Sequence, residues 1–265
     1  MTENDFQTIF LTHPDSMVLQ VTLNRPDSSN AFNTQMAREI YQLFENLALD
    51  AGDMRVVIIT GAGERAFCAG GDLKERKGMT NDAWARQHLI YERMTRAIIN
   101  CPLPVIAAVN GAAYGGGCEM VAAVDFAYAA DHARFALTET SLGIIPGAGG
   151  TQTLSRAIGE RRAKELILSA TPFSANHARE WGLINEVFPK ETLLAETLQC
   201  ATRIASNAPI AVRQAKQSIH RGLQLSLSDG LAFEIEAYNR TVPTQDRMEG
   251  ILAFNEKRKP MFQGN

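Results

Sequence analysis

The chain has 265 residues, of which 45% are hydrophobic and 21% charged, enough for one large core or a domain with an appendage. Its 26 basic and 29 acidic residues are mixed along the sequence, which argues against the basic face of a nucleic-acid-binding protein. We find no apolar run of the roughly 18 residues needed to span a membrane. The polar and acidic first ten residues lead us to expect a cytoplasmic protein.

The first third of the chain predicts a hairpin, a helix and a buried strand. Apolar and polar residues alternate over 17–24, after a turn-like segment, so residues 7–12 and 17–24 are expected to pair. From Thr34, which we take as the N-cap, apolar residues lie on one helical face to about residue 50. The run 56–59 is typical of a strand buried on both faces.

Strand and helix patterns then alternate, which predicts a parallel sheet covered by helices. The elements expected here are a glycine-rich loop at 61–72, a helix at about 80–99, a strand at 105–109, a short helix from about 117, and strand-like residues at 126–130 and 135–137. Beyond Gly150 helical patterns dominate, and only 184–187 resembles a strand. We therefore predict an α/β core over residues 1–190 and a helical region over 191–265.

The four cysteines are expected to be buried free thiols: Cys68, Cys101, Cys118 and Cys200. No C-x-x-C pair occurs, and no His lies a few residues away from any of them. The spacing therefore predicts neither a disulfide framework nor a metal site.

Three glycine-rich loops follow buried elements, at 61–72, 115–117 and 146–150. The first fits the G-x-G-x-x-A pattern of dinucleotide-binding loops. However, no helix opens directly after it, and Asp82, the acid near the expected spacing, begins a helix instead. The alternative is that the loops around Gly71 and 115–117 direct backbone N–H groups toward one oxygen, as in an oxyanion hole. The simplest interpretation is that each loop is a tight turn.

Two acidic residues, Glu119 and Glu139, favour a catalytic interpretation of these loops. An acid in the first turn of a helix is common, but the neighbours of Glu119 are apolar, and a buried carboxylate needs a partner or a function. Two half-buried carboxylates can be held at different pKa values, as acid/base catalysis near neutral pH requires. The five histidines are scattered, and no G-x-S-x-G, H-E-x-x-H or P-loop motif occurs.

Several motifs resemble the enoyl-CoA hydratase/isomerase (crotonase) superfamily over almost the whole chain. They are LNRP (23–26), NAFN (30–33), AFCAGGDL (66–73), GGGCE (115–119), TETSLGIIPGAGGTQ (138–152) and EGILAFNEKR (249–258). The resemblance implies an α/β fold, the crotonase-like spiral of ββα turns, with a helical C-terminal trimerisation region. It also implies assembly as a homotrimer or a hexamer made of two trimers. The substrate would be an acyl-coenzyme A thioester, so that coenzyme A belongs to the substrate and no separate cofactor is expected.

The resemblance also assigns residues. It implies that the N–H groups of Gly71 and Gly116 form the oxyanion hole, and that Glu119 and Glu139 are the two carboxylates of hydratases. Because isomerases and hydrolases of the superfamily usually keep only one carboxylate, the pair favours hydration. The positions that match coenzyme A contacts are Arg25, Ala31, Ala69, Asp72 and Leu73, with Phe254 and Lys257 reaching over from a neighbouring subunit. Asp27 stands where relatives often carry a Lys near the nucleotide. The resemblance therefore does not extend to the phosphate contact that this Lys would make.

Three stretches look closest to methylglutaconyl-CoA hydratases, at 73–79, 163–166 and 241–250. This similarity implies a branched acyl group with a second carboxylate, which would need a cation when buried. The helix expected after the first glycine loop offers Lys74, Arg76, Arg86 and Arg93, and Arg76 is the first candidate because it lies nearest Gly71. The alternative is that all four are solvated helix charges.

The expected reaction is the reversible addition of water to an α,β-unsaturated acyl-CoA. Glu119 is assigned to the water that attacks C3 and Glu139 to proton exchange at C2, a division of labour that the sequence leaves open. The first alternative is an isomerase or decarboxylase on the same fold, and a remote one is a non-catalytic RNA-binding or scaffold protein. Apolar residues in the expected helices 209–221 and 226–239 predict burial between subunits.

Overall fold

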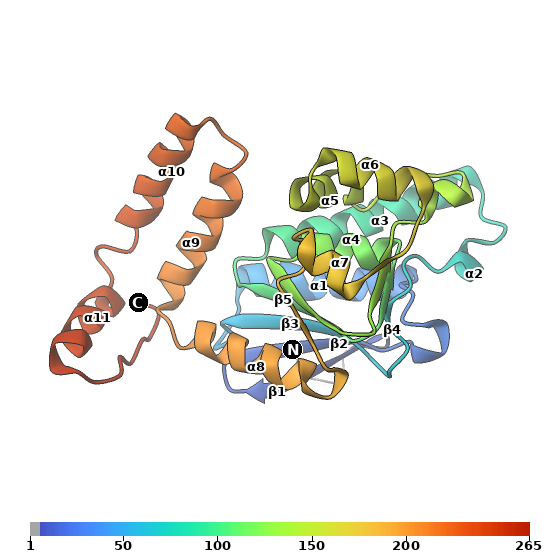
Figure 1. The fold of residues 1–265 in the computed structure, drawn as a ribbon. Coiled ribbons are helices and arrows are strands. Elements are labelled where there is room, and N and C mark those ends of the chain that lie inside the picture. Colours follow the sequence, from blue (N-terminus) through green and yellow to red (C-terminus); the bar gives the residue numbers. More distant parts are fainter. Residues whose placement is uncertain (1–5) are drawn as a thin grey trace.

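The computed structural model describes residues 6–265, so the expectation for the first ten residues lies partly outside the described range. The core is built on a six-stranded sheet with helices on both faces (Figure 1). Its strand order is β1 (Ile9–Asp15), β2 (Val18–Leu23), β3 (Val56–Gly61), β5 (Val105–Val109), β7 (Phe126–Ala130) and β10 (Glu186–Phe188). β1 and β2 form the predicted antiparallel hairpin, and all other pairs are parallel, which confirms the predicted sheet.

A second, four-stranded sheet joins shorter segments that follow the strands of the first. Its order is β4 (Ala66–Cys68), β6 (Ala112–Tyr114), β8 (Arg134–Ala136) and β9 (Phe173–Ser174). Successive strands β3 and β4, β5 and β6, and β7 and β8 thus alternate between the two sheets, and helices follow each pair. This arrangement confirms the predicted spiral of ββα turns.

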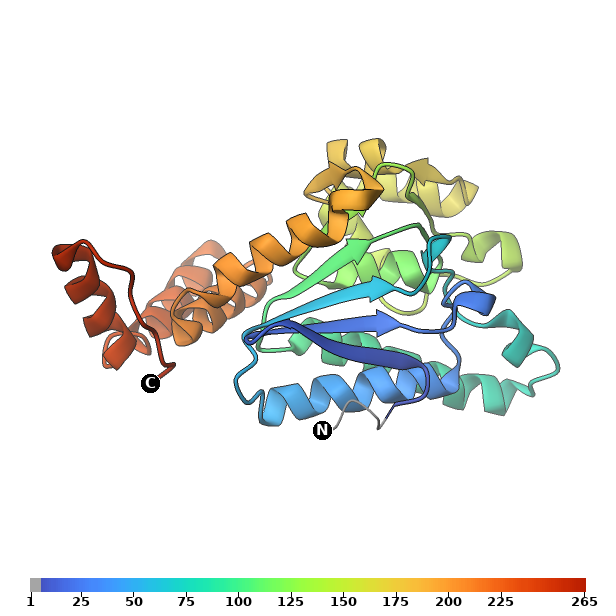
Figure 2. The same cartoon turned by 90° about the horizontal axis from the view of Figure 1, so that it is seen from below.

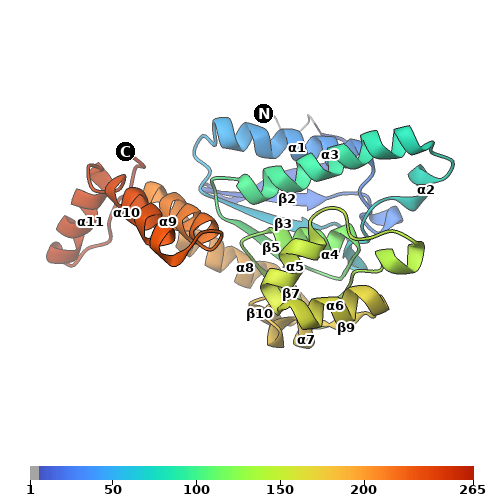
Figure 3. The same cartoon turned by 90° about the horizontal axis from the view of Figure 1, so that it is seen from above.

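The helices of the core lie on opposite sides of the large sheet. They are α1 (Thr34–Leu49), α2 (Leu73–Arg76), α3 (Asn81–Asn100), α4 (Gly116–Ala123), α5 (Gly150–Ile158), α6 (Glu160–Ser169), α7 (Ala175–Glu180) and α8 (Lys190–Ala205). Figure 3 shows α1 and α3 side by side over one face. The side chains of β3 point alternately to the two faces of the sheet. Val57 and Ile59 pack toward α1 and α3, whereas Val56 and Ile58 pack toward α8. The prediction that β3 is buried on both faces is therefore confirmed.

The last three helices form an arm that projects from the core (Figures 1 and 2). α9 (Pro209–Gly222) and α10 (Leu227–Asn239) pack against each other, and α11 (Gln245–Glu256) follows. Lys216 of α9 ties the arm to the core through an ion pair with Asp125, with 2.6 Å between Nζ and Oδ2. Because α8 packs on the sheet, the projecting part begins at α9, and the proposed division at residue 190 stays a prediction.

Two local predictions were wrong. The N-cap of α1 is Asn33, whose side chain accepts a hydrogen bond from the Met36 N–H, and Thr34 is already helical. α3 confirms the helix expected at about 80–99, with Thr80 as its N-cap, but Lys74 and Arg76 do not belong to it, because they lie on the separate helix α2 and the chain between the two helices is extended at Lys77. Within residues 6–265, none of the helices has the length and apolar character that crossing a membrane would need.

Candidate active site

Glu119 lies on α4 among buried apolar neighbours, and only 3% of its surface is exposed. Its Oε1 accepts hydrogen bonds from the backbone N–H groups of Ala148 and Gly150, both at 2.8 Å. The glycine at 150 is required for this contact, because a Cβ there would lie 2.8 Å from the Cγ of Glu119. The glycine-rich loop before α5 therefore holds the Glu119 carboxylate in one orientation.

Glu139 begins the short 3-10 helix η2 (Glu139–Leu142), directly after β8, and is 8% exposed. Its Oε2 is buried and has no hydrogen-bond partner among residues 6–265. Gly115 approaches the other oxygen so closely that a Cβ would lie 3.1 Å from Oε1, and its φ of +51° also favours glycine. A buried acceptor without a donor is costly, which indicates a group kept for a ligand or a proton.

Both carboxyl groups have elevated pKa values. Burial raises the pKa of Glu119 to about 7, and the nearby Glu139 raises it as well, whereas the N–H groups of Gly150 and Ala148 oppose the shift. Burial also raises the pKa of Glu139 above its ordinary value. Proton exchange near neutral pH is what acid/base catalysis requires of such groups.

A backbone bridge between Phe32 and Gly71 leaves one N–H group available for a ligand. The bridge is parallel, with the Phe32 N–H donating to the Gly70 carbonyl at 2.8 Å and the Asp72 N–H donating to the Phe32 carbonyl at 3.0 Å. Because a parallel bridge uses the residues that flank Gly71, the N–H of Gly71 itself points to the other side.

A second N–H group comes from the start of α4, which packs closely on its surroundings. A Cβ on Gly117 would lie 2.1 Å from the Cys68 carbonyl oxygen, and one on Gly116 would lie 2.2 Å from the Phe32 ring. Gly116 is the first residue of α4, so its N–H has no acceptor within the helix, and Gly115 offers no capping side chain. The positive end of the helix dipole adds to its affinity for a negatively charged oxygen.

A cavity of about 510 Å³ connects these groups: it is lined by both glutamates and by Gly71 and Gly116. The structure thus brings together the four residues assigned to the acyl chemistry. Among the lining residues that the sequence reasoning missed are Trp84, His88 and Tyr91 on α3. Their i, i+4, i+7 spacing places them on one helical face, a periodic signal that is present in the sequence.

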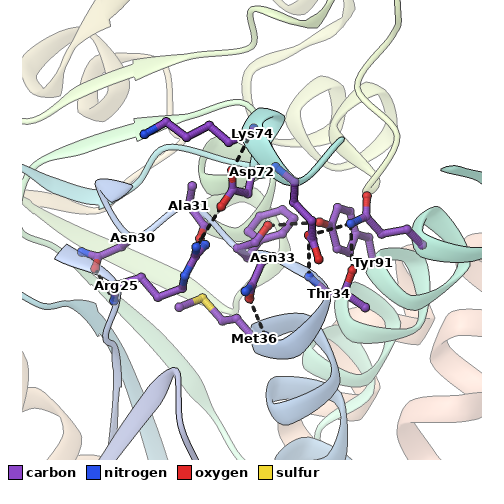
Figure 4. A network of polar contacts seen from close by, with 12 residues as sticks. Arg25, Asn30, Ala31, Asn33, Thr34, Met36, Asp72, Lys74 and Tyr91 are labelled. Carbon is purple, nitrogen blue, oxygen red and sulfur yellow. Dashed lines mark hydrogen bonds and ion pairs between the residues drawn. The ribbon is translucent and has the colours of Figure 1, made fainter. Parts of the chain in front are cut away.

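The predicted coenzyme A contacts fall into two groups. Arg25 and Asp72 form an ion pair at 2.8 Å, and Asp72 also caps α2 by accepting from the Lys74 N–H (Figure 4). Ala31 lies buried beside this pair, its carbonyl accepting from Arg25, whereas Ala69 and Leu73 are exposed along the same segment. These residues frame the loop that carries Gly71, but none of the five lines the cavity, and their contact with coenzyme A stays a prediction.

The other group, Phe254 and Lys257, lies on the projecting arm, and the structure does not bring these residues to the cavity of the same chain (Figure 1). Both side chains are exposed. Their position agrees with a contribution to a neighbouring subunit, which stays a prediction.

Metal-ligating side chains do not cluster in groups of three or more anywhere in residues 6–265. All four cysteines are free thiols, with Cys200 partly exposed and the other three buried, close to the expectation.

Comparisons with known proteins place this arrangement in a family. The model of the enoyl-CoA hydratase/isomerase family matches residues 14–265. The chain belongs to this family.

Relatives match over nearly the whole chain. The chain is 40% identical to the short-chain-enoyl-CoA hydratase of Clostridium acetobutylicum, over 92% of this chain and 94% of the relative. It is 39% identical to the mitochondrial enoyl-CoA hydratase of Pongo abelii, over 92% and 82% of the two chains. The crystal structure of enoyl-CoA hydratase from Bacillus anthracis superposes with a TM-score of 0.96 at 45% identity, covering 98% of this chain and 100% of that chain. The predicted crotonase superfamily and its enzyme class are thus confirmed.

Proposed function

We propose that the protein is an enoyl-CoA hydratase that adds water reversibly to an α,β-unsaturated acyl-CoA. The observation that carries the proposal is the pair of buried carboxylates, Glu119 and Glu139, facing one cavity with two free backbone N–H groups. In the family, a double-bond shift needs a single proton-transferring group, whereas addition of water needs one group for the water and one for carbon.

The hydrogen bonds of the two carboxylates suggest which one activates water and which one gives its proton to C2. Two N–H groups hold Oε1 of Glu119, which leaves Oε2 to orient water and take its proton as the oxygen bonds to C3. Glu139 lacks donors for Oε2, so the neutral acid is favoured there, and its proton can pass to C2. Water thus supplies the hydroxyl on C3, and the proton that it loses returns to the enzyme.

The thioester oxygen gains enolate character while C3 is attacked. The N–H groups of Gly71 and Gly116 would bind this oxygen and stabilise the transition state, because they are fixed by the fold before the substrate arrives. Donors of this kind contribute about 3–4 kcal/mol each in enzymes where one has been removed.

The proposed function is tested by product analysis with pent-2-enoyl-CoA, a substrate that distinguishes hydration from isomerisation. Mass spectrometry and chromatography should find 3-hydroxypentanoyl-CoA as the product. Formation of pent-3-enoyl-CoA instead would favour the isomerase alternative, and loss of carbon dioxide from a carboxylated thioester would favour a decarboxylase.

A branched dicarboxylic acyl group of the methylglutaconyl type stays a prediction that rests on three sequence stretches. The expected cytoplasmic location also stays a prediction, since three of the relatives are named as mitochondrial.

We also propose that the arm assembles the protein into a homotrimer or a hexamer. Seven apolar residues of α9, α10 and the turn between them are exposed in the single chain: Ile219, Leu223, Leu225, Leu227, Leu231, Ile235 and Tyr238. Leu223 and Leu227 are 79% and 81% exposed, and an apolar surface of this kind on a single chain marks an interaction site.

Light scattering at micromolar concentration is expected to give the mass of three or six chains. Replacing Leu231 and Ile235 by Asp should shift the protein toward smaller species, because a carboxylate buried between subunits lacks a partner. A wild-type protein that stays monomeric under these conditions would contradict the proposed assembly.

A further inference from the structure

Gln87 of α3 is only 3% exposed, and both ends of its side-chain amide are hydrogen-bonded. The amide nitrogen donates to the Thr34 hydroxyl at 2.8 Å and to Oε2 of Glu75 at 2.7 Å. The amide oxygen accepts from Nε of Arg76 at 2.8 Å. One buried side chain of α3 therefore binds the first residue of α1 and two residues of α2.

The partners of Gln87 lie just beyond the backbone bridge that orients Gly71. The bridge joins Phe32 to Gly71, and Thr34 follows the first residue as Glu75 follows the second. Oε2 of Glu75 also accepts from the Thr34 N–H at 2.9 Å, within the network around Thr34 in Figure 4. A bridge of a single residue pair has few backbone hydrogen bonds, so these side-chain links decide how firmly the two segments are held together.

Arg76 extends the influence of Gln87 to Gly71 itself. A Cβ built on Gly71 would lie 3.7 Å from the guanidinium carbon of Arg76 and 3.5 Å from Cε2 of Tyr91, so both side chains bound the space beside the glycine. The same guanidinium carbon lies 4.1 Å from the centre of the Trp84 ring and 5.0 Å from that of the Tyr91 ring. A cation stacked on two rings and bonded through Nε has one preferred position.

The neighbouring cations are placed differently. Of the four that the sequence offered, Arg76 lines the cavity, whereas Lys74, Arg86 and Arg93 are exposed and do not line it. Arg86 directly precedes Gln87 in α3, so the two positions share one stretch of helix and differ in burial. A substitution at Arg86 is therefore a matched control for one at Gln87.

We propose that Gln87 is a positioning residue of the oxyanion hole: it holds α2 against the start of α1 and so keeps the Gly71 N–H directed at the thioester oxygen. The proposal rests on the hydratase function and deepens it. Gln87 does not line the cavity, so it acts through Gly71 rather than on the substrate. A displaced Gly71 N–H should slow the reaction without weakening the binding of the neutral thioester, because this donor matters most when the oxygen gains negative charge.

Gln87→Met removes the three hydrogen bonds and keeps an unbranched side chain of similar length. It should lower kcat for hydration of crotonyl-CoA by roughly tenfold or more, within the 10²–10³-fold that the loss of a whole oxyanion donor costs. KM should stay within about threefold of wild type, since the lost interaction belongs to the transition state. Arg86→Met should leave both values unchanged, and wild-type kcat in Gln87→Met would overturn the proposal.

A reciprocal exchange separates this role from a general loss of stability. Gln87→Glu alone sets a second carboxylate against that of Glu75, so the link between α3 and α2 should be lost and kcat should fall. In the double variant Glu75→Gln/Gln87→Glu, the amide and the carboxylate change places. The hydrogen bonds between these two positions, to Thr34 and to Arg76 can then all form again. The double variant should recover most of the lost kcat, and no recovery at an unchanged melting temperature would contradict the proposed role.

Binding of two thioesters without a double bond tests the donor itself. Acetoacetyl-CoA can bind as its enolate, which absorbs near-ultraviolet light and carries part of its negative charge on the thioester oxygen, whereas the thioester oxygen of butyryl-CoA is neutral. Gln87→Met should weaken enolate binding by about the factor by which it lowers kcat, while the affinity for butyryl-CoA in calorimetry stays within about twofold. Equal weakening of both thioesters would overturn the proposal. If enolate binding alone is weakened but the wild-type protein hydrates no enoyl thioester, the hydratase function fails while the positioning role stands.

Discussion

Glu119→Gln and Glu139→Gln are each expected to lower kcat for hydration by about 100-fold or more, since general acids and bases typically contribute 10²–10⁴-fold. Gln has nearly the shape of Glu, so the fold should persist. In Glu119→Gln the amide oxygen can still accept from the N–H groups of Ala148 and Gly150, but the side chain no longer takes a proton from water. In Glu139→Gln the proton for C2 is lost.

The pH dependence of kcat/KM adds a check that structural damage would not reproduce. With its pKa raised to about 7, Glu119 loses its basic form as the pH falls, so kcat/KM for hydration should decrease below about pH 7. The residual activity of Glu119→Gln should lack this decrease. If either variant kept near wild-type kcat with an unchanged melting temperature, the role assigned to that residue would be wrong.

Gly116→Ala is expected to lower kcat by about 100-fold, comparable to the loss of one oxyanion donor. The new Cβ would lie 2.2 Å from the Phe32 ring, which is almost fully buried. The ring cannot retreat easily, because Tyr91 packs edge-on against it at 4.8 Å and donates to the Phe32 carbonyl. Relief of the clash should therefore move the start of α4 away from the bridge between Phe32 and Gly71.

A second substitution distinguishes this steric cause from a general loss of stability. Phe32→Leu removes the ring atoms that the new methyl group would meet, so the double variant should recover part of the kcat lost in Gly116→Ala. Overpacking of a core typically costs about 1–3 kcal/mol of unfolding free energy, which thermal denaturation can measure alongside. Wild-type kcat in Gly116→Ala, or no recovery in the double variant, would show that this contact does not place the donor.

Much of the fold could be predicted because its long elements carry strong periodic patterns. β3 and β5 are continuous apolar runs, and α1 and α3 show one apolar face over four or more turns. In the second sheet, only β8 overlaps a predicted strand-like stretch, at 135–137, whereas β4, β6 and β9 escaped notice, because they have only two or three residues each. A strand of that length has too few positions to show an alternation, and its pairing depends on segments distant in sequence.

The residues of the site also differ in whether the sequence could predict them. Glu119 could be singled out because an acid amid apolar helical residues is unusual, and the glycines around it mark close backbone approaches. The bridge between Phe32 and Gly71 and the contact of Arg76 with Gln87 had no local signal, since they join different segments of the chain. The separate short helix α2, which places Arg76 in the cavity wall apart from Arg86, was also missed.

The central claim, that two carboxylates add water across one double bond, is tested most directly in water labelled with oxygen-18. The purified protein is given crotonyl-CoA, and the thioester products are analysed by mass spectrometry for wild type, Glu119→Gln and Glu139→Gln. The account predicts 3-hydroxybutyryl-CoA with the label in its C3 hydroxyl for wild type, and at least about 100-fold slower formation in both variants. Unchanged crotonyl-CoA with wild type, or label appearing only in a free acid released by thioester hydrolysis, would contradict it.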